Sequence, residues 1–343
     1  MCNKFIWLAA FSALAGAVSQ PVAAQTEPQA AYQQPLAAKS LLTDIVTVKG
    51  NSLVAAGARG HILLSSDGSN WQQAMVPVQA NLNSVYFLSK DLGWAVGHDA
   101  TILHTTDGGN SWSLQQYAPQ TDKPLFDIIF FDKQNGIAVG AYGLFYRTTD
   151  GGNSWRQEFH AEVLNEDDQS FLSELKETDP EAYEIELGAI LPHFNRLYAD
   201  GNVLYMVGEA GFTAKSTDRG QSWNRLEEFY NGSLFDITRS ANMSLVAVGL
   251  RGHAFRSKDQ GASWSQLVPD ASATFNSAFS DENGRLYLVG NGGTLLISKD
   301  DGESFADHSQ ANGKAIVNGL VWQDKLVLVT ETGVTTIMLS ELE

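Results

Sequence analysis

Six aspartates recur in the same local sequence, which makes them the most regularly spaced carboxylates of this chain. TTDGGNSW stands at residues 105–112 and again at 148–155, and its variants space the aspartates by 40, 43, 68, 41 and 41 residues. Such a carboxylate can accept hydrogen bonds from N–H groups of its own turn, each worth about 1.5–3 kcal/mol. The glycine supplies a positive φ, and the aromatic residue anchors the turn. We therefore expect a structural role for Asp67, Asp107, Asp150, Asp218, Asp259 and Asp300, and for Trp71, Trp112, Trp155, Trp223, Trp264 and Phe305.

The segments around each aspartate predict the fold. Three short β-branched and aromatic runs, separated by Gly, Asn or Asp, precede the aspartate, and one run follows it. A period near 40 residues built from four short strands predicts the blades of a β-propeller. A seventh copy, residues 316–339, has three strands and no aspartate turn. We expect Ala31–Leu36 to supply its outer strand. The fold is then all-β, a seven-bladed β-propeller of four-stranded blades closed by strands from the N- and C-termini.

The turns between the second and third strands provide the candidate recognition surface. We expect these turns to gather at one mouth of the central channel, where they form a ring of mixed charge. Arginines of this ring can pair with carboxylates and a tyrosine can stack, so the ring can clamp a peptide or loop of a protein client. The alternative is that the turns are polar because they are exposed. The candidate partner-binding residues are Arg59, His98, Asp99, Tyr142, Glu209, Arg251, Asn291 and Glu331.

One connection is much longer than the others and forms an insertion at about residues 158–191. Between Glu166 and Glu186 it carries nine acidic residues and one lysine. We expect a helix capped within residues 167–170, with Phe171, Leu172 and Leu175 on one side, and a second helical turn that begins at Pro180. The insertion is expected to lie over the channel mouth. It either docks a basic client segment or is a solvated acidic surface.

The N-terminal residues indicate export. Lys4, the apolar run 5–18 and small residues up to Ala24 predict a signal peptide over residues 1–24, so that the propeller spans residues 25–343 of an exported protein in a periplasm or thylakoid lumen. The only cysteine, Cys2, lies in this leader, which excludes disulfides and cysteine metal sites from the mature chain. The formal net charge of −17 disfavours nucleic acid as a partner. We expect a monomer with no cofactor, no metal and no direct membrane insertion.

The repeated turns also carry a resemblance to a known family. The S/T-x-D-x-G-x-S-W turns resemble Asp-box (BNR) repeats. Together with the second strands GWAVG, IAVG and VAVG and the run TILHTTDGG, they resemble the photosystem II stability/assembly factor family over roughly residues 30–343. The resemblance implies a seven-bladed propeller that holds a newly made membrane subunit without catalysing a reaction. This chain departs from the photosynthetic members, which present a basic patch, because its own surface is strongly acidic.

The alternative function is a glycosidase or sialidase, because Asp-box propellers also occur in that class. Such an enzyme needs two carboxylates that flank the scissile bond, or a tyrosine nucleophile with an arginine cluster. Asp99, Glu209 and Glu331 can supply carboxylates, but only Arg59 and Arg251 stand at the expected mouth. The sequence contains no G-x-S-x-G, H-E-x-x-H or P-loop motif. We therefore expect a binding scaffold with no catalytic residue.

Overall fold

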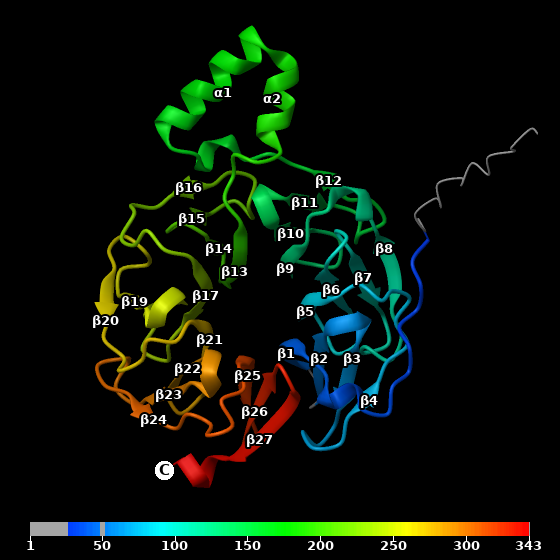
Figure 1. The fold of residues 1–343 in the computed structure, drawn as a ribbon, viewed down its shortest axis with the longest axis vertical. Helices are drawn as coiled ribbons and strands as arrows, with labels where there is room; N and C mark the ends of the chain where they lie inside the picture. Colours follow the sequence, from blue (N-terminus) through cyan, green and yellow to red (C-terminus); the bar gives the residue numbers. More distant parts are fainter. Residues whose placement is uncertain (1–26, 49–51, 343) are drawn as a thin grey trace, which may run out of the picture.

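Seven antiparallel sheets stand around a common axis in the computed structural model, which describes residues 27–48 and 52–342 (Figure 1). The predicted signal peptide and Cys2 lie outside the described residues. The strands are β1 Leu42–Val48, β2 Ser52–Gly57, β3 Ile62–Ser65 and β4 Gln72–Gln73 in blade 1; β5 Leu82–Phe87, β6 Gly93–Gly97, β7 Ile102–Thr105 and β8 Ser113–Gln116 in blade 2; β9 Leu125–Phe130, β10 Gly136–Gly140, β11 Phe145–Thr148 and β12 Arg156–Gln157 in blade 3; and β13 Phe194–Asp200, β14 Val203–Gly208, β15 Thr213–Ser216 and β16 Asn224–Arg225 in blade 4. They continue with β17 Leu234–Arg239, β18 Leu245–Gly249, β19 Ala254–Ser257 and β20 Ser265–Leu267 in blade 5; β21 Phe275–Ser280, β22 Leu286–Gly290, β23 Leu295–Ser298 and β24 Ala306–Asp307 in blade 6; and β25 Ile316–Trp322, β26 Lys325–Thr330 and β27 Gly333–Met338 in blade 7.

The predicted seven-bladed propeller is therefore confirmed, with one strand per blade nearest the axis and up to three outside it. The second strands are buried on both faces, which explains why they read as continuous apolar runs such as GWAVG and LVAVG. Six of them end in glycine. A Cβ on Gly97 would stand 2.0 Å from the carbonyl oxygen of Asn81, so only glycine allows this close approach of the chain.

The prediction that Ala31–Leu36 forms the outer strand of the last blade is wrong. In the described residues blade 7 has three strands. The N-terminal segment instead follows the outer edge of blade 1, where Ala31 N donates to Val76 O at 2.9 Å and Gln33 Nε2 donates to Ala74 O at 3.0 Å. The outer strand of blade 1 is only two residues long, so the chain beyond it has free backbone groups that the N-terminal segment can use.

The ring closes by direct packing of blade 1 on blade 7. Leu42, Ile45 and Leu53 share one buried apolar cluster with Trp322 and Val327. Two further hydrogen bonds cross the same junction: Lys325 Nζ donates to Asp67 O at 2.8 Å, and Thr336 Oγ1 donates to Gly68 O at 3.1 Å. Burial of apolar surface and these polar contacts replace the strand exchange that the sequence led us to expect.

The insertion folds into two helices, α1 Glu166–Thr178 and α2 Pro180–Leu187. The second helix begins at Pro180 as predicted, but the first is capped earlier, because Asn165 Oδ1 accepts the N–H of Asp168 at 2.8 Å. Leu172 is buried, whereas Phe171 is 47% exposed, so the buried apolar face of α1 is narrower than the sequence predicts.

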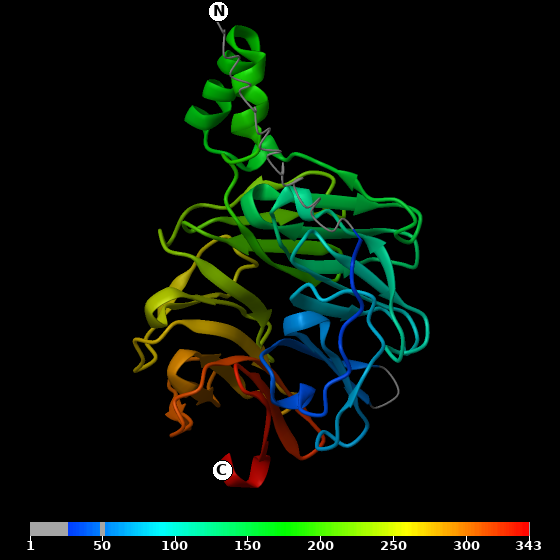
Figure 2. The same cartoon turned by 45° about the vertical axis from the view of Figure 1, so that its right-hand side comes forward.

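The helices do not lie over the channel. Figures 1 and 2 show both of them projecting outward from the edge of the ring at blades 3 and 4. The reason is the attachment of their base. Val163, Leu164 and Leu191 are buried in the apolar cluster between these two blades, and Arg225 Nη1 donates to Val163 O at 3.3 Å.

The six aspartate turns have the hydrogen bonds that the sequence predicted. Asp107 Oδ1 accepts the N–H of Ser111 at 3.0 Å, and Asp107 Oδ2 accepts the Ser111 hydroxyl at 2.6 Å. Thr105 Oγ1, which the sequence analysis overlooked, donates to Asp107 Oδ1 at 2.8 Å. Equivalent bonds recur at Asp150, Asp218, Asp259 and Asp300, and the shorter first turn holds Asp67 through Ser69 and Asn70.

The aromatic residue of each turn packs between its own blade and the preceding one. Trp112 contacts the cluster that contains Val54 of blade 1, and Trp223 contacts the cluster that contains Ile137 of blade 3. These aromatic residues thus lie at the junctions between neighbouring blades.

A belt of polar side chains surrounds the axis inside the ring. Each blade contributes the third residue of its first strand. We call this set the channel belt: Asp44, Ser84, Asp127, Arg196, Asp236, Ser277 and Asn318. Six of its members are buried, and the seventh, Arg196, is partly exposed.

The belt connects every blade to the next. Asp44 Oδ2 accepts the N–H of Val85 in blade 2 at 2.9 Å, and Ser84 Oγ donates to Asp127 Oδ1 in blade 3 at 2.8 Å. The remaining junctions are made by Leu197 N to Asp127 Oδ2 at 2.8 Å, Arg196 Nε to Asp236 Oδ1 at 3.2 Å, Ala278 N to Asp236 Oδ2 at 3.1 Å, Ser277 Oγ to Asn318 Oδ1 at 2.8 Å, and Asn318 Nδ2 to Asp44 Oδ1 at 2.6 Å.

Arg196 is the only cation of the belt and partly compensates its three carboxylates. Its Nε lies 3.6 Å from Asp127 Oδ2 and 3.2 Å from Asp236 Oδ1. Burial raises the pKa of Asp44 and of Asp236 above the ordinary value, and the neighbouring guanidinium opposes that rise. Arg196 therefore stabilises the ionised forms of Asp44 and Asp236.

Replacement of Arg196 by methionine is expected to destabilise the fold by about 3 kcal/mol at pH 7, the low end for a broken buried ion pair because this arginine is partly exposed. The loss should be smaller at pH 5. The carboxyls with a raised pKa then take up protons and no longer need the cation. Urea unfolding followed by tryptophan fluorescence measures both values. Arg59→Met is the control, and equal stability of the two variants at pH 7 would contradict the proposed role of the belt.

The aspartate turns contribute to the pH dependence of folding stability in acid. Hydrogen bonds from the hydroxyl and then the N–H of Ser154 lower the pKa of Asp150 to about 2, and Ser263 has the same effect on Asp259. A lowered carboxyl pKa contributes stability above the unfolded value near 4, and this contribution disappears as the pH falls through about 2. We expect Asp150→Asn/Asp259→Asn to be less stable at pH 7 and to lose less stability between pH 4 and pH 2. Parallel pH profiles of variant and parent would refute this.

Candidate partner-binding site

The predicted ring residues lie on the face opposite the aspartate turns, in the turns that follow the second strands. Five of these turns hold a residue other than glycine in the left-handed conformation: Arg59, Asp99, Tyr142, Ala210 and Arg251, with φ of 59°, 60°, 52°, 50° and 57°. The sixth blade has Gly292 there, with φ of 69°. Because this conformation favours glycine, large side chains kept at this position point to a function for them.

Two of the predicted residues, Tyr142 and Glu209, lie close together at blades 3 and 4, where His193 contacts both. The imidazole of His193 packs edge-on against Tyr142 at 4.5 Å between centroids, and its Nδ1 lies 3.7 Å from Glu209 Oε2. The backbone N–H of His193 donates to Glu209 Oε1 at 3.1 Å. Phe126 lies 5.9 Å from the same imidazole. His193 and Phe126 were not predicted as site residues, because neither stands in a turn between second and third strands.

A groove of about 590 Å³ continues this surface to blade 5, where Glu209 and Arg251 line it together with Tyr230. Tyr230 stacks on His253 at 4.8 Å. In the described residues the guanidinium groups of Arg59 and Arg251 are exposed and have no ion pair or hydrogen bond. They are therefore available to a carboxylate of a partner.

The remaining ring residues lie apart from this cluster. Asp99 lines a separate hollow with Tyr117, Asn291 Oδ1 accepts from Asn276 Nδ2 at 3.1 Å, and Glu331 pairs with Lys314 at 3.1 Å. His98 is exposed on the same turn as Asp99. The three ring carboxylates thus occupy three different environments.

The channel itself opens on this face as a cavity of about 360 Å³, which we call the axial cavity. All seven first strands or their approaches contribute to its wall. Its lining includes the rings of Phe126, His193 and Phe235, the side chains of Asn83, Asn195 and Asn276, and Val317. Arg196 of the channel belt lies at its inner side. The cavity is therefore a single opening framed by aromatic rings and side-chain amides.

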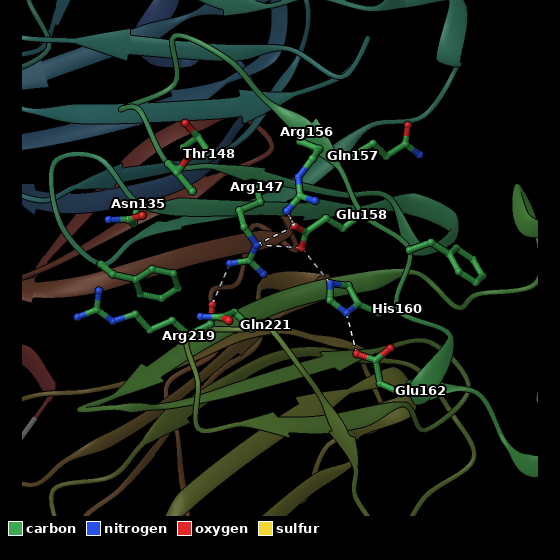
Figure 3. Close-up of a pocket in the computed structure, with 13 residues that line it drawn as sticks. Asn135, Arg147, Thr148, Arg156, Gln157, Glu158, His160, Glu162, Arg219 and Gln221 are labelled. Atoms are coloured by element: carbon green, nitrogen blue, oxygen red, sulfur yellow. Dashed lines mark hydrogen bonds and ion pairs between the residues drawn. The ribbon is translucent and has the colours of Figure 1, made fainter.

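A second hollow of about 790 Å³ lies at the outer edge between blades 3 and 4 (Figure 3). Arg147 Nε lies 2.9 Å from Glu158 Oε2, and Arg147 Nη1 donates to the carbonyl oxygen of Arg219 at 3.1 Å. His160 stands between Glu158, at 3.5 Å, and Glu162, at 2.8 Å. Since each carboxylate already has a cation or an imidazole as partner, this network fastens the start of the insertion to blade 4.

Residues 27–48 and 52–342 bring no three His, Cys, Asp or Glu side chains into an arrangement suited to a metal ion. No helix among those same residues has the length and hydropathy of a membrane span.

Comparison with known proteins decides the family. A profile described as Photosynthesis system II assembly factor YCF48 matches residues 63–163 and 115–285, which together cover more than half of the sequence. The chain belongs to this family. The resemblance inferred from the repeated turns is confirmed. A comparison with curated proteins gave no match.

Solved structures support the same fold. One described as "YCF48 bound to D1 peptide" has a TM-score of 0.66 and 21% identity, covering 93% of this chain and 99% of the other. A second, "YCF48 from Cyanidioschyzon merolae", has a TM-score of 0.66 and 16% identity, covering 90% and 98%. A catalytically inactive virginiamycin B lyase from Staphylococcus aureus with quinupristin has a TM-score of 0.58 and 10% identity, covering 89% and 96%. At these identities the likeness establishes the propeller alone, and the lyase shows that this fold also supports enzymes.

Arg59→Gly and Arg251→Gly are each expected to stabilise the fold by about 0.5–1 kcal/mol, because glycine removes the cost of the left-handed conformation. The reciprocal change Gly292→Ala, at a position with nothing within 4 Å of the added Cβ, should destabilise by about 1 kcal/mol. Chemical denaturation measures all three. Loss of stability in both arginine variants would show that these side chains have a structural role.

Proposed function

We propose that this member of the YCF48 family is an exported, non-enzymatic scaffold that holds a segment of a membrane-protein client while its complex is assembled. A periplasm or a thylakoid lumen is the proposed location, on the basis of residues 1–24. One observation carries the proposal: the seven blades converge on a single opening lined by aromatic rings and amides, and the turns around it carry two arginines that have no ion pair in the described residues, while their carboxylates stand apart. This arrangement suits peptide recognition better than hydrolysis.

The comparisons support a peptide as the bound species. A relative with the same fold is described with a D1 peptide bound. In this chain the exposed turns of the mouth have cations at Arg59 and Arg251, and an aromatic cluster at Tyr142 and His193 lies between them along the ring. A client loop that lies across the mouth can place carboxylates on the arginines and apolar or aromatic side chains on the rings.

The proposal is tested by crosslinking and affinity capture from the cell envelope with the full chain. The double variant Arg59→Glu/Arg251→Glu is expected to lose a captured membrane protein, because both cations become repulsive to its carboxylates. The matched control is Lys90→Glu/Lys258→Glu, which reverses two exposed lysines near the aspartate turns on the other face.

Two outcomes would overturn the proposal. One is equal capture of the same protein by both double variants, which would show that the arginines of the mouth do not take part in client binding. The other is turnover of aryl glycosides by the purified protein together with its loss on replacement of a single ring carboxylate, which is the behaviour of a hydrolase.

A further inference from the structure

We propose that the axial cavity binds the cationic side chain of a lysine or arginine of the client. This inference rests on the proposed function, since the cation is supplied by the segment that lies across the mouth. It assigns a ligand class to the cavity itself, whereas the arginines of the turns bind groups of the opposite charge around it.

Three asparagine amides give the cavity an excess of hydrogen-bond acceptors. Asn83 Nδ2 donates to Leu125 O at 2.7 Å, and Asn195 Nδ2 donates to Leu234 O at 2.8 Å. Asn276 Nδ2 donates in the same way to Ile316 O at 2.8 Å. Each bond fixes the amide with its nitrogen toward the next blade.

The three amide oxygens are consequently left without a donor from the described residues, on side chains that line the cavity. An ammonium group provides three N–H donors and a guanidinium provides five, so either can satisfy several of these oxygens at once. A carboxylate, which only accepts, cannot.

The rings at the rim fit the same ligand. Phe126 and Phe235 line the cavity on two different blades, and the imidazole of His193 stands beside Phe126. A cation that enters between aromatic faces is attracted by their negative quadrupole, and the methylene stem of lysine or arginine packs against the ring carbons.

The charge below the cavity has the sign that a cation requires. The channel belt contains three carboxylates and one guanidinium, and Arg196 directs its Nε toward two of them, Asp127 and Asp236. The belt thus has three carboxyl groups against one guanidinium, and this excess of acidic groups favours a cation. An anion attracted by Arg196 would face all three carboxylates within the same belt, so its binding is disfavoured.

The test titrates the full mature protein with n-butylammonium, with butan-1-ol as a neutral probe of the same length and with butyrate as the anion. Ligand-observed NMR measures each dissociation constant. Butylammonium is expected to bind about tenfold more tightly than butan-1-ol, and butyrate more weakly than both.

Val317 lines the cavity and its side chain has no hydrogen-bonding group, so it provides variants that leave the belt intact. Val317→Lys places a competing ammonium in the cavity and is expected to weaken butylammonium binding about tenfold, while Val317→Glu strengthens it and Val317→Met changes it little. Thermal unfolding confirms that each variant is folded.

Preferential binding of butyrate that is strengthened by Val317→Lys would overturn the inference and assign the cavity to anions through Arg196. Equal binding of all three probes would also overturn it. The result is separable from the proposed function: capture of a client without ammonium binding rejects only this inference, whereas ammonium binding without a client rejects the scaffold role and the client as the source of the cation, and leaves the cavity as a cation site.

Discussion

The channel belt is the constraint on which the rest of the structure depends. A propeller blade buries its two faces against its neighbours, but apolar packing by itself does not fix how many blades meet or how the last one joins the first. In this chain a polar group of each first strand bonds to the next blade, and Asn318 returns the circuit to Asp44. Apart from the contact made by the partly exposed Arg196, these bonds join buried residues, and each would leave an unsatisfied group if the register changed.

This belt explains why the two faces of the ring can have different roles. The six aspartate turns lie on one face, and each carboxylate accepts hydrogen bonds from its own turn. On the other face the equivalent turns differ from blade to blade, as Arg59, Tyr142 and Gly292 illustrate. The exposed turns can vary in this way because they contribute little to closure of the ring, which depends on the channel belt. The binding surface proposed here occupies the variable face.

The repeated turn made the propeller predictable from the sequence, because its six copies give the period of the blades and the strand pattern of residues 316–339 adds the seventh. The belt was missed because its seven positions hold four residue types, Asp, Ser, Arg and Asn, with no motif in common. A signal was present: the second residue after the Leu, Phe or Ile that opens each first strand is polar in all seven units, as in Leu42–Asp44 and Phe194–Arg196. Alignment of the first strands would have revealed it.

The two wrong predictions, the path of Ala31–Leu36 and the position of the insertion, concern features that tertiary contacts decide. The path of Ala31–Leu36 depends on which blade leaves its outer edge open, and a two-residue strand such as β4 is not visible in a sequence pattern. The outward direction of α1 and α2 depends on Val163 and Leu191 at their base, which resemble any other apolar residues of a loop. The aromatic cluster at His193 was not predicted for a similar reason, since it joins a residue of β9, a residue of the turn after β10 and the residue before β13.

Site-specific photocrosslinking tests most directly the claim that the mouth face, and not the face of the aspartate turns, receives the client. A photoreactive phenylalanine analogue is placed either at Tyr142, which is 46% exposed at the mouth, or at Asn110, which is exposed in an aspartate turn. The account predicts a crosslink to a membrane protein of the envelope from position 142 and none from position 110. A crosslink from position 110 alone would contradict it.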